Sequence, residues 1–305
     1  MTKAVFTMQS ISKKPSSRPL LTPYLYLTPT LVFMVVLLLI PVVIVVSYSF
    51  MDRVITAPDS TLVGFKNYRE VLVNPTFHAA LKNTLFFTVV SVIAHMIIGL
   101  TFALLLNTEH VGRITKAIYR TIFVLPWLLT VAIIAVLWRL LLNPNGIINY
   151  LLGLVGLVGN NFEWLSNPDA ALLIVTFINI WAGYPFFMIS LLAGLQGISR
   201  DLYEAAAVDG AGKIRTFWSI TIPQLRPIII SMALLDLIWT SQQFALIWMT
   251  TGGGPMDKTE MLSTFTYKLA FASYDFSGAS ASAVIILLLS MVLAFFYVRH
   301  QHSME

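Results

Sequence analysis

The sequence of 305 residues contains no cysteine, and only 11% of its residues are charged. The missing cysteine excludes disulfides, thiol catalysis and cysteine-ligated zinc or iron–sulfur sites. Five histidines are present, and His95 has no companions in the sequence that would complete a metal site, so we expect a hydrogen-bonded packing residue. No phosphate-binding loop of the GxxxxGK[ST] pattern occurs, so the chain does not bind ATP by that route.

Apolar residues are abundant instead, at 57% of the chain, with a mean hydropathy of +0.81. Soluble domains carry about 25% charged residues, so this composition indicates a membrane protein. A helix needs about 20 apolar residues to cross the hydrocarbon core. Six stretches qualify, and they predict an all-α polytopic protein with spans at about 25–50, 84–107, 119–141, 170–193, 227–249 and 279–298.

Lysine and arginine are distributed unevenly between the predicted loops. Placing the N-terminus inside puts twelve of them on the cytoplasmic side, in residues 1–24, 108–120, 194–226 and 299–305, against seven outside. The positive-inside rule then predicts that both termini and loop 194–226 are cytoplasmic. The formal charge of +5 therefore reflects membrane topology, and nucleic-acid binding is not indicated.

Loop 194–226 is the longest charged interval between two spans, and its pattern predicts two short helices joined by a bend. Ser199 or Asp201 can cap the first helix. Gly210 and Gly212 can end it with a positive φ, and we expect Pro223 to end the second helix. A short cytoplasmic helix surrounded by cations is suited to contact with another protein.

The same loop carries a spaced motif: Glu204-Ala205-Ala206, then Gly210, Ile220 and Pro223. In this motif the chain resembles the permease subunits of ABC importers. Further matches resemble the sugar-type permeases of the maltose and glycerol-3-phosphate class, and they cover nearly all of residues 24–299. They are Gly64-Phe65-Lys66-Asn67-Tyr68, Leu125-Pro126-Trp127 and Thr251-Gly252-Gly253-Gly254-Pro255.

The resemblance implies a permease domain over 25–298 between cytoplasmic tails 1–24 and 299–305, in the inner membrane of a bacterial cell. It implies a second homologous permease subunit, two cytoplasmic ATPase subunits that bind ATP and Mg, and an extracytoplasmic solute-binding protein, with membrane lipid around the spans. The chain itself would be no enzyme and hold no cofactor or metal. The residues expected to couple it to the ATPase are Glu204, Ala205, Ala206, Asp209, Gly210, Ile220 and Pro223.

Two interpretations of Glu204 stay open. Its carboxylate can pair with a basic residue of the ATPase, or it can close a capping box by reaching back to Asp201. Gly210 suits either interpretation, because a helix that stops beside a docking surface needs a local chain reversal.

Polar and aromatic residues within the fourth and fifth spans are the candidates for a solute pathway. Aromatic planes stack on sugar rings and amides bond hydroxyl groups, although ordinary helix packing would use the same residue types. Asp236 is the only acid inside a predicted span, so it should face the bundle interior, as a solute ligand or as a structural hydrogen-bond partner. The candidates are Asn179, Trp181, Tyr184, Asp236, Trp239, Gln242, Gln243 and Phe244.

The predicted function is therefore the translocation of a sugar or related polyol by alternating access, driven by ATP hydrolysis in the partner subunits. A self-sufficient ion-coupled secondary carrier is the alternative, for which only Asp236 and His95 could form a relay. An intramembrane enzyme would need a nucleophile–base pair or a metal constellation, and none converges in the sequence. The sequence does not name the solute.

Overall fold

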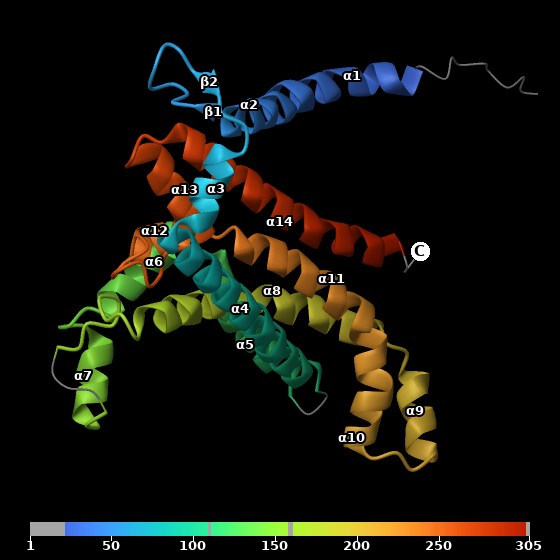
Figure 1. Ribbon diagram of the computed structural model, residues 1–305. Helices are drawn as coiled ribbons and strands as arrows, with labels where there is room; N and C mark the ends of the chain where they lie inside the picture. Colours follow the sequence, from blue (N-terminus) through green and yellow to red (C-terminus); the bar gives the residue numbers. More distant parts are fainter. Residues whose placement is uncertain (1–21, 109–110, 158–160, 303–305) are drawn as a thin grey trace, which may run out of the picture. The chain divides into compact units, whose positions relative to one another are not determined.

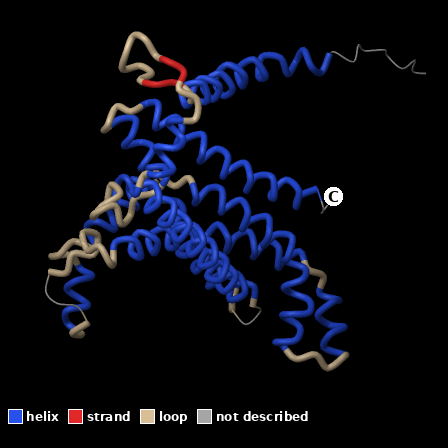
Figure 2. Tube along the Cα trace, viewed as in Figure 1, coloured by secondary structure: helices blue, strands red, loops and turns tan. Residues whose placement is uncertain are grey.

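The computed structural model describes residues 22–108, 111–157 and 161–302. The tail cations Lys3, Lys13, Lys14 and Arg18 lie outside the described residues, as do residues 303–305. Helices make up nearly all of the regular structure, and one two-stranded antiparallel pair accompanies them (Figure 2). The predicted all-α class is confirmed.

The chain divides into two compact units, residues 1–45 and 46–305. The first unit contains α1 (Thr22–Met34), the π-helical turn η1 (Val35–Leu39) and the beginning of α2 (Ile40–Ser49). The continuous helical stretch Tyr24–Ser49 is 26 residues long and strongly apolar, so it is long enough to cross a bilayer. None of the side chains in its most apolar window is buried, as a lipid-facing helix requires.

The second unit holds the remaining elements (Figure 1). In chain order they are β1 (Met51–Asp52), β2 (Thr61–Leu62), α3 (Lys66–Val73), α4 (Pro75–Asn107), α5 (Arg113–Leu128), α6 (Val131–Leu141), α7 (Ile147–Leu154), α8 (Ala171–Gly197), α9 (Arg200–Val208), α10 (Lys213–Thr216), η2 (Phe217–Thr221), α11 (Ile222–Ser241), α12 (Ala245–Thr250), α13 (Leu262–Phe271) and α14 (Phe276–His302). β1 pairs with β2 through Met51 and Leu62.

Five helical stretches in the described residues are long and apolar enough to span a membrane, and a bent pair makes up to six. The bent pair is the third predicted span, which is not one continuous helix. α5 and α6 are inclined by 98° at Leu129–Thr130. The break forms because Leu129 is extended and the Thr130 side chain accepts from the Ile133 backbone N–H, which starts a new helix.

The fifth span also departs from the predicted bounds. Pro223 does not end the preceding helix, because α10 continues through the π-helical turn η2 into α11. Pro223 follows directly after η2, where the Ile222 N–H bonds the Phe217 carbonyl five residues back, so the regular i→i−4 hydrogen bonds are already displaced at the point where the proline lacks an N–H. At the other end α11 stops at Ser241, and residues 242–244 separate it from α12.

α4 and α8 form the central pair of the second unit, and they make the most extensive contact between any two described elements (Figure 1). Gly99 allows this approach, because a Cβ at this position would lie 2.5 Å from the Cβ of Phe187. α11 packs against both helices, and α5 packs against α8. The apolar core of this region is Ala103, Leu106, Phe187, Met188, Leu191, Leu192, Leu195, Leu225 and Met232.

Two further apolar clusters extend the core along the unit. One joins α4, α6, α8 and α12 around Phe87, Trp138, Ile178 and Ile247. The other joins α3, α4, α13 and α14 around Phe77 and Phe265. These clusters fix the helices that surround the candidate site.

Candidate functional site

A cavity of about 270 Å³ lies between α4, α5, α6, α8 and α11. Its polar lining comes from five residues, two of which can carry a charge. The complete lining is His95, Pro126, Trp127, Leu129, Val131, Ile134, Asn179, Ala182, Gly183, Asp236, Trp239, Thr240 and Gln243. The bend between α5 and α6 contributes the residues from Pro126 to Ile134, so the break in the third span forms part of the wall.

Asp236 is buried, and both of its carboxylate oxygens are engaged. Oδ2 lies 2.7 Å from Nδ1 of His95, and Thr240 donates its hydroxyl to Oδ1 at 2.9 Å. The other ring nitrogen of His95 donates to the backbone carbonyl of Asn179 at 3.1 Å. The pair therefore links α4, α8 and α11, and its burial agrees with the expectation that an intramembrane acid faces the bundle interior.

The aromatic part of the wall consists of two tryptophans that the structure leaves about half exposed. Trp127 and Trp239 are 49% and 58% exposed, and each ring lies against Phe186, at centroid distances of 6.0 and 5.7 Å. Indole faces that are not packed on both sides can stack on a ring of a bound molecule.

Of the eight residues predicted to line a solute pathway, the cavity contains Asn179, Asp236, Trp239 and Gln243. The other four point elsewhere. Trp181 packs edge-on against Trp138 at 5.4 Å, and the Tyr184 hydroxyl donates to the backbone carbonyl of Phe123. Gln242 donates to Ser290 on α14, and Phe244 stacks with Trp248.

Nine residues of the wall were not among the predicted pathway residues, and three of them, His95, Trp127 and Thr240, carry side-chain groups able to hydrogen-bond. Trp127 and Thr240 carry no signal that separates them from packing residues. His95 does carry such a signal, because it is a histidine inside a predicted span, as Asp236 is an acid inside another. Gly183 makes room for it, because a Cβ there would lie within 2.4 Å of the imidazole. In the described residues, no three histidine, aspartate or glutamate side chains gather as a metal site would require.

In the loop between α8 and α11 the structure forms the first predicted short helix, α9, and a bend, whereas the second, α10, continues into α11 and is not a separate short helix (Figure 1). Ser199 caps α9 by accepting from the Asp201 backbone N–H at 3.3 Å. Gly210 ends the helix with a φ of +73°, and the N–H groups of residues 210 and 211 bond the carbonyls of 207 and 206. This is a Schellman motif, so the expected helix end with a positive φ at Gly210 is confirmed. Gly212 has a negative φ, and the expectation of a positive one there is wrong.

The cap at Ser199 changes the interpretation of Glu204. A capping box pairs the cap with the third helical residue, which is Leu202 in this helix. Glu204 is exposed and makes no hydrogen bond or ion pair with another described residue. It lies beside a cavity of about 650 Å³ that is also lined by Lys116, Gln196 and Arg200. The capping interpretation is therefore wrong for this geometry.

The other coupling candidates lie on the same two helices. Ala206, Asp209 and Ile220 line a small depression of about 130 Å³ between α9 and η2. Large apolar side chains around it are exposed: Val208, Ile214 and Trp218 are 88%, 79% and 64% exposed. Exposed apolar side chains that alternate with charged ones, as Ile214 does between Lys213 and Arg215, mark a surface that another protein can cover. Ala205 is exposed on α9, and Pro223 stands where the chain enters α11.

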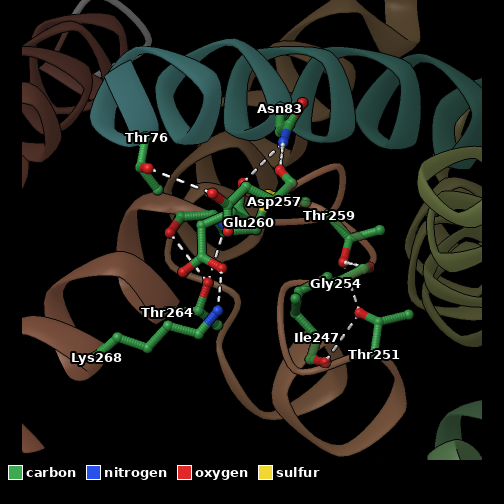
Figure 3. A network of polar contacts seen from close by, with 11 residues as sticks. Thr76, Asn83, Ile247, Thr251, Gly254, Asp257, Thr259, Glu260, Thr264 and Lys268 are labelled. Atoms are coloured by element: carbon green, nitrogen blue, oxygen red, sulfur yellow. Dashed lines mark hydrogen bonds and ion pairs between the residues drawn. The ribbon is translucent and has the colours of Figure 1, made fainter. Parts of the chain in front are cut away.

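At the opposite end of the helices, a polar network fixes the connection between α12 and α13 (Figure 3). Lys268 donates to the fully buried Glu260 at 2.5 Å, and Asn83 on α4 donates to the backbone carbonyls of Asp257 and Glu260. Gly253 has a φ of +91°, and a Cβ there would collide with the Glu260 carboxylate. Burial raises the pKa of Glu260, and the Lys268 ammonium opposes that rise.

The cavity, the loop between α8 and α11 and the long apolar helices together describe a membrane component with a surface that can contact another protein. The sequence profile of the family described as binding-protein-dependent transport system inner membrane components matches residues 95–304. The chain belongs to this family. It is therefore an inner-membrane component of a binding-protein-dependent transport system, and its family is one of transport subunits rather than of enzymes.

Proteins with a similar sequence or structure match almost the whole length of this chain. The trehalose/maltose transport system permease protein MalF of Thermococcus litoralis is 36% identical over 89% of this chain and 90% of its own length. The sn-glycerol-3-phosphate transport system permease protein UgpA of Pectobacterium atrosepticum is 31% identical over 91% and 93%. A chain in the crystal structure of a bacterial alginate ABC transporter, in complex with alginate pentasaccharide-bound periplasmic protein, superposes with a TM-score of 0.79 at 25% identity, over 90% and 92%.

Proposed function

We propose that this permease subunit moves a sugar or related polyol into the cytoplasm through the cavity around Asp236. The observation that carries the proposal is the lining itself: two half-exposed indoles beside a carboxylate and two amide side chains. Indole faces stack on the CH faces of a sugar ring, and carboxylate and amide groups bond its hydroxyls. The relatives named for trehalose/maltose, glycerol-3-phosphate and alginate support this class of solute.

The energy for transport would enter through the loop between α8 and α11. In the proposed assembly, two ATPase subunits bind ATP and Mg in the cytoplasm, and each covers the two-helix loop of one permease. The exposed Val208, Ile214 and Trp218 supply apolar contacts for such a docking, and the exposed Glu204 supplies a charge. α11 is continuous with η2 and α10, so a movement of the loop is transmitted directly to the helix that carries Asp236.

Alternating access would then open the cavity to one side of the membrane at a time. A second homologous permease completes the pathway, and a solute-binding protein delivers the solute from outside. In this arrangement both termini and the two-helix loop are cytoplasmic, while the Glu260 network lies on the external side.

The test is uptake into proteoliposomes that contain the complete complex. The binding protein, loaded with its radiolabelled carbohydrate, is added outside, and ATP is enclosed inside. We expect accumulation that requires ATP hydrolysis, with a non-hydrolysable ATP analogue as the control. Uptake driven by a proton gradient without ATP would favour the secondary carrier, and a non-carbohydrate cargo would contradict the proposed solute class.

A further inference from the structure

The hydrogen bonds around His95 determine the charge of the cavity wall. A backbone carbonyl oxygen can only accept, so Nε2 of His95, 3.1 Å from the Asn179 carbonyl, carries a hydrogen. The contact of 2.7 Å between Nδ1 and Oδ2 of Asp236 then needs a second hydrogen between the two atoms. That hydrogen resides either on the histidine, which gives an imidazolium and a carboxylate, or on the aspartic acid beside a neutral imidazole. In both arrangements the pair has no net charge.

The rest of the wall adds no positive group. Among the described residues that line the cavity there is no lysine and no arginine. The single group that can become cationic is the His95 imidazole, and both of its N–H positions are committed, one to Asp236 and one to α8. An anionic solute that leaves water for this cavity would therefore find no free cation to replace its hydration, which makes its entry unfavourable.

The neutral polar groups suit hydroxyls instead. The Nδ2 group of Asn179 is buried without a partner among the described residues, and the side-chain amide of Gln243 makes no hydrogen bond to a described residue. Oδ1 of Asp236 accepts one bond from Thr240 and keeps a second lone pair. A polyhydroxylated molecule can use donors and acceptors of this kind without carrying a charge.

We infer that this permease is selective for uncharged sugars and excludes phosphorylated and carboxylated ones, and that His95 is the positioning residue that neutralises Asp236. The inference rests on the proposed function and narrows it, because the relatives include a permease named for a phosphorylated solute. His95 acts through Asp236, and Gly183 allows its ring to sit between α4 and α8.

The charge class is tested by taking the binding protein from cells with its natural cargo and determining the cargo by mass spectrometry. The same loaded protein then delivers that cargo to the wild-type complex in proteoliposomes. A neutral sugar that is imported supports the inference. Import of a sugar phosphate or a uronic acid overturns the inference and leaves sugar transport intact. A cargo that is no carbohydrate defeats the proposed function itself.

The role of His95 is tested with two substitutions at the same position. His95→Leu removes both ring donors and leaves the buried Asp236 without its partner, whereas the shorter amide in His95→Asn keeps a donor near the position of Nδ1. We expect His95→Leu to lower the maximal uptake rate of the neutral cargo by about tenfold or more, and His95→Asn to recover most of it. Assembly is checked by co-purification of the subunits.

The affinity of the binding protein for its cargo is the same in the assays of the wild-type, His95→Leu and His95→Asn complexes, since the binding protein is not altered. If assembled complexes of both variants transport equally well, or equally poorly, His95 does not act through a hydrogen bond to Asp236. If His95→Leu does not assemble, the His95→Asn variant alone decides, because a wild-type rate supports the donor role and a tenfold loss contradicts it.

Discussion

Nζ of Lys268 lies 2.5 Å from Oε2 of Glu260, and the glutamate is fully buried while the lysine side chain is 35% exposed. Removing Lys268 leaves a buried charge unpaired, whereas Glu260→Gln removes that charge. We therefore expect Lys268→Met to cost about 3–5 kcal/mol and Glu260→Gln distinctly less. Thermal unfolding of the purified complex measures both, and Lys258→Met, at an exposed lysine in the same connection, is the control.

The Lys268→Met defect should also depend on pH. Burial raises the pKa of Glu260 above its ordinary value of 4.5, so the folded state favours the protonated acid. The acid is neutral in both states below 4.5, and its stabilising contribution is lost as the pH rises through the raised pKa. The difference in melting temperature between Lys268→Met and wild type should widen between pH 4.5 and pH 7. A constant difference over this range would contradict the buried ion pair.

The helical architecture could be predicted from the sequence because bilayer thickness sets the length of each apolar run. The breaks within the spans could not be predicted in the same way. Leu129–Thr130 and residues 242–244 contain no glycine or proline, and their helices stop where packing and capping favour a new direction. In the loop, by contrast, the Schellman end at Gly210 was predictable, because the requirement is local.

Residue type selected eight candidates for the pathway, and half of them line the cavity. Only the geometry separates these four from the rest. Consecutive helical residues point about 100° apart, so a Gln242-Gln243 pair gives no indication of which amide faces the interior. The pairing of His95 with Asp236 joins positions 141 residues apart in the sequence. No local sequence pattern predicts a contact between residues so far apart in the chain.

The two glutamines provide a matched pair for testing the pathway. Gln243 lines the cavity, and Gln242 is exposed and bonded to Ser290. We expect Gln243→Ala to lower uptake by about tenfold, equivalent to about 1.4 kcal/mol, and Gln242→Ala to leave it near wild type. The measurement is the initial rate with saturating loaded binding protein. A loss confined to Gln242→Ala would place the pathway on the α14 side of residues 242–244.

Orientation can be measured without background because the natural chain has no cysteine. Arg113, Lys213 and Lys258 are all exposed, so a cysteine at each can react. We expect Arg113→Cys and Lys213→Cys to be protected in intact cells from a membrane-impermeant maleimide, and Lys258→Cys to be labelled. After the membrane is opened all three should react. Labelling of Lys213→Cys from outside would overturn the proposed topology.

Glu204 offers the sharpest test of coupling to the ATPase. It is exposed on α9 without a partner among the described residues, and Ser199 supplies the helix cap. Glu204→Lys therefore leaves the cap intact and reverses a charge at the docking surface, where a like-charge contact costs several kcal/mol. We expect solute-stimulated ATP hydrolysis or subunit co-purification to collapse, and a compensating acidic change on the ATPase to restore it.

Ser199→Ala is the matched control for that experiment, because it removes the cap and keeps the charge. It should cost about 0.5–2 kcal/mol of local helix stability and leave stimulated hydrolysis largely intact, since docking can supply the lost order. The two variants thus distinguish the loss of a charged contact from the loss of helix stability at two nearby positions of the same helix. If Ser199→Ala abolished stimulation while Glu204→Lys retained it, coupling would depend on the fold of α9, and the contact with the ATPase would be made by exposed apolar residues such as Val208 and Trp218.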